Sequence, residues 1–176
     1  MQTMDGAIAM NQRPSGTLTW ALLILTALSV PPGCGPKEGT MDPAQLKTFG
    51  TRYTAAWCSQ NAASVAAFFS ETGSLQINNG AASVGRTAIT AAAQGFMTAF
   101  PDMIVAMDGV DPKGNRATYR WTLTGTNKGP GGTGKAVRIS GYEEWRFGPD
   151  GLIAESKGHF DEADYQRQLS ADASGK

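Results

Sequence analysis

The spacing of hydrophobic residues changes along this chain from a helical period in its middle to a strand period near its end. Asp42 and Pro43 provide an N-cap and a first helical position, and apolar residues then recur at helical spacing, which predicts a helix over 42–58. A second, short helix is expected over 62–71, followed by a strand over 74–80 that ends in an Asn-Gly turn. A third helix over 87–100 ends where proline follows.

The second half of the chain predicts four long strands, over 103–110, 116–126, 136–147 and 152–160. The segments between them are rich in turn-forming residues, so neighbouring strands are expected to pair antiparallel. A closing helix is predicted over 161–169. Helices first and strands last predict an α+β domain in which helices cover one face of a curved sheet.

A predominantly apolar segment near the N-terminus lies outside this pattern and predicts export. Residues 17–30 form it, and they are fewer than the roughly 20 residues that a membrane-spanning helix needs, which is typical of a signal sequence. Cys34 follows Gly33 at its end, as in the bacterial lipoprotein signal, in which the cysteine becomes lipidated. Pro31, however, stands where that signal usually carries leucine, and a retained N-terminal anchor is the alternative.

These features divide the chain into a signal segment over 1–34, a tether over 35–41, one folded domain over 42–170 and a disordered tail over 171–176. The expected location is the bacterial cell envelope, either lipid-anchored or periplasmic, or the secreted state. Contact with a membrane is expected only through lipid on Cys34.

Composition narrows the class of partner. A chain of 176 residues that is 41% hydrophobic can form one domain with a substantial core. Its 15 basic and 15 acidic residues show no basic excess, so a nucleic-acid partner is not expected. Besides Cys34 the chain has only Cys58, and two cysteines make neither a disulfide framework nor a zinc site. No metal site is expected.

The only histidine of the chain, His159, stands two residues before Asp161 at the end of the last predicted strand. Positions two apart in a strand share a face, so the two side chains are expected to point together and to carry proton chemistry. Asp161 also stands where the N-cap of the closing helix belongs, and its carboxylate could instead accept from the backbone N–H of Asp164.

Several short phrases in the domain occur in an order that resembles a known superfamily. They are Trp57 late in the first predicted helix, Gly85-Arg86 before the third, Phe100-Pro101-Asp102 after it, Trp121 to Thr126, Gly151-Leu152-Ile153 and Gln168-Leu169. They resemble the SnoaL-like polyketide cyclase branch of the nuclear transport factor 2-like superfamily. The resemblance implies a curved, mostly antiparallel sheet wrapped around three helices as a cone with an internal pocket. It also implies a homodimer through the outer sheet face and no cofactor.

The resemblance further implies roles for particular residues. In SnoaL-like cyclases an aspartate seven residues before the Gln-Leu pair acts as acid and base, and Asp161 has this spacing to Gln168. His159 would share the proton or bond the enolate oxygen. The implied ligand is a small apolar molecule whose carbonyl group takes part in that chemistry.

The limonene epoxide hydrolases share the Phe160-Asp161 ending, but the residues that assist the aspartate are absent here. Where those enzymes carry an Arg-x-Asp pair and a Tyr-x-Asn pair, this chain reads Arg120-Trp121-Thr122 and Leu75-Gln76-Ile77. Epoxide hydrolysis is therefore not expected, because nothing would hold the attacking water.

The same alignment predicts which residues face the cavity. Leu75, Ile77, Arg120 and Thr122 would share the cavity face with His159 and Asp161, and an ion pair between Arg120 and Asp161 would lower the pKa of the aspartate. The further ligand-binding candidates are aromatic: Tyr53, Trp57, Phe96 and Tyr142.

Two other motifs do not support a site. The stretch 129–135 has the glycine and lysine spacing of a phosphate-binding loop, but Ala136 follows where Ser or Thr is required, and a strand follows instead of a helix. It predicts a glycine-rich hairpin connection. Glu143 and Glu144 lie on opposite faces of their strand, so at least one of these carboxylates is expected in solvent.

Two functions remain open from the sequence. The first is a cofactor-independent cyclase or isomerase that uses Asp161 as acid and base. The second is a noncatalytic ligand-binding or dimeric accessory protein of the cell envelope.

Overall fold

In the computed structural model, which describes residues 41–170, the first helix begins at the predicted cap. Helix α1 (Pro43–Cys58) follows Asp42, whose Oδ1 accepts hydrogen bonds from the backbone N–H groups of Ala44 and Gln45 at 2.9 and 3.0 Å. The Gln45 side chain accepts in return from the Asp42 N–H, which completes a capping box. The predicted signal segment 1–34 with Cys34, most of the tether and the tail 171–176 lie outside the described residues.

The second helix is shorter than predicted, because the strand after it begins earlier. Helix α2 (Ala62–Ala66) is followed directly by β1 (Phe69–Ile77), so the prediction of helix to residue 71 was wrong. Phe69 is completely buried and pairs with Ile153, and this tertiary pairing overrides the helical spacing of the local sequence. A two-residue strand, β2 (Ser83–Val84), leads into α3 (Gly85–Ala99).

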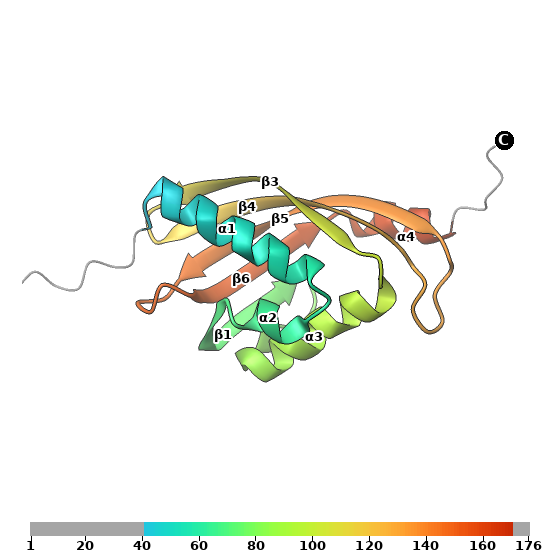
Figure 1. Ribbon diagram of the computed structural model, residues 1–176, viewed down its shortest axis with the longest axis horizontal. Coiled ribbons are helices and arrows are strands. Elements are labelled where there is room, and N and C mark those ends of the chain that lie inside the picture. Colours follow the sequence, from blue (N-terminus) through green and yellow to red (C-terminus); the bar gives the residue numbers. More distant parts are fainter. Residues whose placement is uncertain (1–40, 171–176) are drawn as a thin grey trace, which may run out of the picture. The chain divides into compact units, whose positions relative to one another are not determined.

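The remaining elements confirm the predicted strands. They are β3 (Ile104–Lys113), β4 (Arg116–Thr126), β5 (Ala136–Phe147), β6 (Ile153–Phe160) and the closing helix α4 (Glu162–Ser170). The six strands form one sheet in the order β2-β1-β6-β5-β4-β3 (Figure 1). All neighbours pair antiparallel except β1 and β6, which are parallel.

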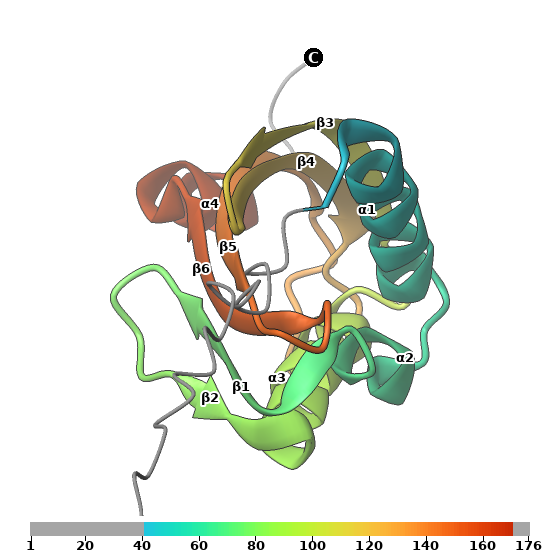
Figure 2. The same cartoon turned by 90° about the vertical axis from the view of Figure 1, so that its left-hand side faces the viewer.

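The sheet is curved and unclosed, and helices α1, α2 and α3 lie against its concave side (Figure 2). Helix α1 packs along β3, and α3 packs against β1, so the two helices cover opposite ends of the concave surface. The predicted α+β architecture, a curved sheet around three helices, is confirmed. None of the helices in residues 41–170 is both long and apolar enough to cross a membrane.

Helix α4 occupies the place beside β5 that β6 leaves open. Strand β6 pairs with β5 only as far as Gly141, and the backbone of Arg138 lies beyond that point. The Gln168 side-chain amide accepts from the Arg138 N–H at 2.7 Å and donates to its carbonyl oxygen at 2.9 Å. One side chain thus satisfies the backbone groups that a longer β6 would have paired.

Gly95, on the exposed side of α3, provides a test of helix stability separate from the pocket. A Cβ added there would meet no atom within 4 Å. We expect Gly95→Ala to raise the free energy of unfolding by about 0.5–1 kcal/mol, because alanine loses less backbone entropy in a helix. Urea denaturation measures the change.

Gly141→Ala is the matched control for this substitution. Its added Cβ would lie 2.6 Å from the Trp121 ring and would also collide with the backbone oxygen of His159. The variant should therefore lose stability, and a gain similar to that of Gly95→Ala would contradict the packing described here.

Candidate functional site

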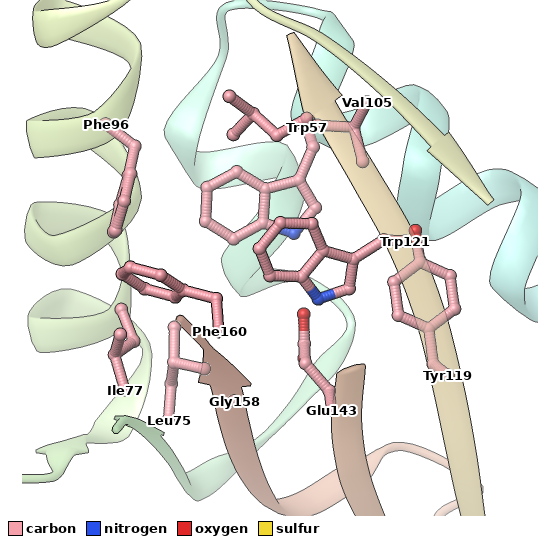
Figure 3. A pocket seen from close by; sticks show the side chains of 11 residues that line it. Trp57, Leu75, Ile77, Phe96, Val105, Tyr119, Trp121, Glu143, Gly158 and Phe160 are labelled. Atoms are coloured by element: carbon pink, nitrogen blue, oxygen red, sulfur yellow. The ribbon is translucent and has the colours of Figure 1, made fainter. Parts of the chain in front are cut away.

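A partly enclosed pocket of about 60 Å³ lies between the end of α1, α3 and the concave side of the sheet (Figure 3). A buried water needs about 10–15 Å³ on this measure, so the pocket accepts a molecule of a few non-hydrogen atoms or the end of a longer one. Eleven residues line it: Trp57, Leu75, Ile77, Phe96, Val105, Tyr119, Trp121, Leu123, Glu143, Gly158 and Phe160.

Strand pairing places one row of these residues across the pocket floor. Tyr119 on β4 pairs with Glu143 on β5, Glu143 pairs with Gly158 on β6, and Gly158 pairs with Ile77 on β1. Residues paired across strands share a face, so all four positions face the helices. Gly158 has no side chain, which leaves space above the floor next to Glu143.

Glu143 is the single carboxyl group among the lining residues, and it is only 6% exposed. Its Oε2 accepts three hydrogen bonds, from Ser156 Oγ at 2.6 Å, Trp145 Nε1 at 2.8 Å and Tyr53 Oη at 3.1 Å. Its Oε1 has only the longer contact to Tyr53 Oη, at 3.4 Å. Oε1 is therefore the oxygen left available to a ligand.

The surroundings of Glu143 raise the pKa of its carboxyl. Glu143 forms no ion pair within residues 41–170. Burial raises the pKa of the Glu143 carboxyl, and the hydrogen bonds from Ser156, Trp145 and Tyr53 offset only part of that rise. A neutral carboxylic acid can donate its proton to a ligand, and its conjugate base is stronger than an exposed carboxylate.

Aromatic side chains surround the carboxyl and hold its hydrogen-bond donors in place. Tyr53 and Trp145 lie with ring centroids 5.1 Å apart, and Trp145 stacks on Tyr119 at 4.7 Å. Burial also raises the pKa of Tyr53, so its hydroxyl remains a proton donor to Glu143. The Tyr119 hydroxyl bonds Thr54 Oγ1 at 2.6 Å and is therefore already partnered.

Trp121 contributes a second polar atom to the pocket. Its indole Nε1 is buried and has no hydrogen-bond partner. The ring lies against Gly141, where a Cβ would be 2.6 Å away, so the glycine is what allows the ring to lie there. Figure 3 shows this nitrogen and the tip of Glu143 on the same side of the pocket.

Four of the predicted ligand-binding residues line the pocket: Trp57, Leu75, Ile77 and Phe96. Tyr53 lies behind the pocket wall, completely buried, and reaches it only through its hydrogen bond to Glu143.

The other predicted side chains lie on the opposite face of the sheet, and their placement in the cavity was wrong. Arg120 pairs with Tyr142, and Tyr142 pairs with His159, in one row across β4, β5 and β6. The Tyr142 and His159 rings stack at 4.8 Å, and Glu144 lies 3.7 Å from His159 Nε2. Thr122 shares this face and donates to Asp108 Oδ2 at 2.7 Å.

The cause is strand alternation. In β4 the apolar core residues Ala117, Tyr119 and Leu123 and the pocket-lining Trp121 share one parity, so Arg120 and Thr122 between them point away from the helices. In β6, Gly158 and Phe160 face the pocket, which turns His159 outward.

Asp161 lies directly before α4 and acts as its cap. Its Oδ1 accepts from the Asp164 N–H at 2.9 Å, and its side chain does not line the pocket. The predicted ion pair with Arg120 is not formed, because Arg120 instead pairs with Asp111.

Glu143 is the residue that reasoning from the sequence missed as a site residue. Buried and exposed positions alternate along β5, and the buried apolar residues are Val137, Ile139, Trp145 and Phe147. Glu143 has the same parity as these residues. A carboxyl at a core position of such a strand was the available signal. Glu144 is exposed, which confirms that one member of the pair lies in solvent.

The part of the chain that the structure describes contains no group of three or more metal-ligating side chains. The thiol of Cys58 is half-buried and donates to the Val105 carbonyl oxygen at 3.3 Å. The stretch 129–135 connects β4 and β5, which confirms the predicted hairpin connection.

Comparison with known proteins assigns the fold. A family model described as SnoaL-like domain matches residues 51–156. Among curated proteins no match is found.

Three solved structures are similar. A hypothetical protein with a ketosteroid isomerase-like fold from Catenulispora acidiphila, in complex with trimethylamine, has 17% identity and a TM-score of 0.63, and the match covers 73% of this chain and 96% of that one. A candidate SnoaL-like polyketide cyclase from Jannaschia has 18% identity and a TM-score of 0.62, over 75% and 99%. SalBIII, an epoxide hydrolase/cyclase-like enzyme of pyran ring formation in salinomycin, has 16% identity and a TM-score of 0.61, over 70% and 95%. At identities this low, the TM-scores show that these proteins share the fold of this chain.

The capping contact of Asp161 leads to a stability prediction. We expect Asp161→Ala to lower the free energy of unfolding by about 1 kcal/mol, and Asp161→Asn to change it little, because asparagine also caps helices. Thermal denaturation of both variants measures this. Equal losses in the two variants would contradict the capping role.

The raised pKa of Glu143 predicts how stability depends on pH. At pH values between 4.5, the ordinary pKa of this carboxyl, and its higher pKa in the folded state, the native protein holds a proton that the unfolded chain releases. The stabilisation is fully present below that ordinary value and is lost as pH rises through the folded-state pKa.

We therefore expect the free energy of unfolding of the wild type to fall relative to that of Glu143→Gln as pH rises. The fall is at most about 1.4 kcal/mol per pH unit. Urea denaturation of both proteins over a series of pH values measures the difference. Parallel pH profiles would show that Glu143 is not protonated preferentially in the folded state.

Proposed function

The chain belongs to the SnoaL-like domain family, and from this premise we propose that its pocket binds a small, largely apolar molecule that carries a carbonyl group. The observation that supports this most directly is the single buried acid, Glu143, in an otherwise apolar and aromatic pocket. Pockets of this composition bind by burying apolar surface and orient the ligand through a few polar atoms.

Glu143 is the group that we propose for proton transfer in a cofactor-independent cyclase or isomerase reaction. Its carboxylate form can remove a proton from the carbon next to the ligand carbonyl, and its acid form can return one. Asp161 is less suited, because its carboxylate is engaged with the α4 backbone and lies outside the pocket.

Two of the similar structures support a small-molecule role. The Catenulispora protein is in complex with trimethylamine, and SalBIII takes part in forming a pyran ring.

A noncatalytic binder is the second candidate function. It is favoured by the lining residues themselves, which include no second acid or base beyond Tyr119, whose hydroxyl is already bonded to Thr54. The apolar segment 17–30 and Cys34 support the further proposal that binding takes place outside the cytoplasm.

Proton exchange on butanone separates the two functions without knowledge of the natural ligand. If Glu143 moves protons, the full-length protein should speed the exchange of the α-protons of butanone in D₂O, followed by ¹H NMR. Glu143→Gln should abolish this exchange while it keeps butanone affinity within about threefold, because the amide still donates a hydrogen bond. Asp161→Asn should exchange like the wild type.

Binding itself is tested by filling the pocket. A Cβ at position 158 would make ordinary contacts, 3.5 Å from Gln76 O and 3.7 Å from Glu143 Cγ, so Gly158→Ala should fold normally and weaken butanone binding at least about fivefold. Gly95→Ala, whose added Cβ would meet no atom of another element within 4 Å, is the control. Binding without exchange would leave the noncatalytic function, and unchanged affinity in Gly158→Ala would rule out the pocket.

A further inference from the structure

One polar atom in the pocket has no hydrogen-bond partner, and a second has only a long hydrogen bond. One is Trp121 Nε1, which is buried and unpartnered. The other is Glu143 Oε1, which has only a 3.4 Å contact to Tyr53, whereas Oε2 accepts three shorter bonds. Native proteins rarely leave buried polar groups unpaired, so an exception beside a pocket calls for a functional explanation.

The sheet brings these two atoms to one place. Trp121 pairs with Gly141, two residues before Glu143 on the neighbouring strand, so Trp121 and Glu143 are diagonal neighbours on one face. Such positions are separated by roughly 7–8 Å at the backbone, within reach of long side chains that lean toward each other. Figure 3 shows the indole nitrogen and the carboxyl tip on the same side of the pocket.

The chemistry of the two atoms selects a hydrogen-bond acceptor. An indole N–H can only donate, and Glu143 in its protonated form donates through Oε1, because Oε2 is occupied by three donors. A ligand hydroxyl would use its own hydrogen only by accepting from one of these two groups and donating to the other. A carbonyl oxygen has two lone pairs and no hydrogen, and it satisfies both donors.

We infer that Trp121 is a specificity-determining residue whose Nε1–H, together with the Glu143 acid, binds the carbonyl oxygen of the ligand. This inference rests on the proposed function, since it names the atoms that recognise the ligand in the same pocket. When Glu143 is the carboxylate that takes up the proton from the neighbouring carbon, the Trp121 N–H remains as the donor to the oxygen on which negative charge develops.

The test compares butanone with 2-methyl-1-butene, in which a CH₂ group replaces the oxygen, on the full-length protein. The Trp121 indole N–H resonance, identified by its absence in Trp121→Phe, should move downfield on addition of butanone and stay in place on addition of the alkene. The variant should lose about three- to tenfold in butanone affinity and less than about twofold in alkene affinity, as expected for one hydrogen bond. Its Trp145 N–H resonance should persist, because that donor bonds Glu143.

Three outcomes would overturn the inference. An unmoved N–H resonance with bound butanone would do so, as would equal losses for both probes in Trp121→Phe. A resonance that responds to Glu143→Gln but not to butanone would assign the N–H to an internal bond with the carboxyl. If any of these outcomes is found while Gly158→Ala still weakens butanone binding, the proposed function stands and only the inference fails. If the wild type binds neither butanone nor the alkene, both the inference and the proposed function fail.

The shift itself is read on the unaltered protein, and if Trp121→Phe folds poorly, Trp121→Tyr identifies the resonance in the same way.

Discussion

A carboxyl group buried among aromatic rings is the constraint on which the rest of this domain depends. Glu143 can remain in the core only because Tyr53, Trp145 and Ser156 supply hydrogen bonds from α1, β5 and β6. Those donors fix the position of the first helix relative to two strands that are distant from it in sequence. Removing all three donors would leave a buried polar group unpaired, which costs more than a hydrogen bond contributes.

The same constraint determines the character of the pocket. No basic side chain of residues 41–170 forms an ion pair with Glu143, so burial raises the pKa of its carboxyl without an opposing charge. The row that includes Gly158 keeps the space beside the acid open. Charged groups such as Arg120 and Glu144 are placed on the other face, where water solvates them.

Prediction from the sequence succeeded where a local pattern and the tertiary environment agree. The bounds of β4 and β5 were predicted to the residue, because their long alternating runs are bounded by turn formers. The start of β1 was missed, since the apolar run around Phe69 fits a helix equally well until pairing with Ile153 is known. The cavity face of β4 was assigned from motif spacing to Arg120 and Thr122, although the parity of Tyr119 and Leu123 indicated the reverse.

The sequence by itself determined the class of fold, the order of its elements, the capping of α1 by Asp42 and the two-sided character of the Glu143-Glu144 pair, because these depend on neighbouring residues. Only the tertiary structure decided that the acid of the pocket is Glu143, that Asp161 caps a helix outside it and that Trp121 faces it with an unpaired N–H. Shifting the register of a strand by one residue exchanges every side chain between core and solvent. Which face is covered depends on helices that pack from elsewhere in the chain.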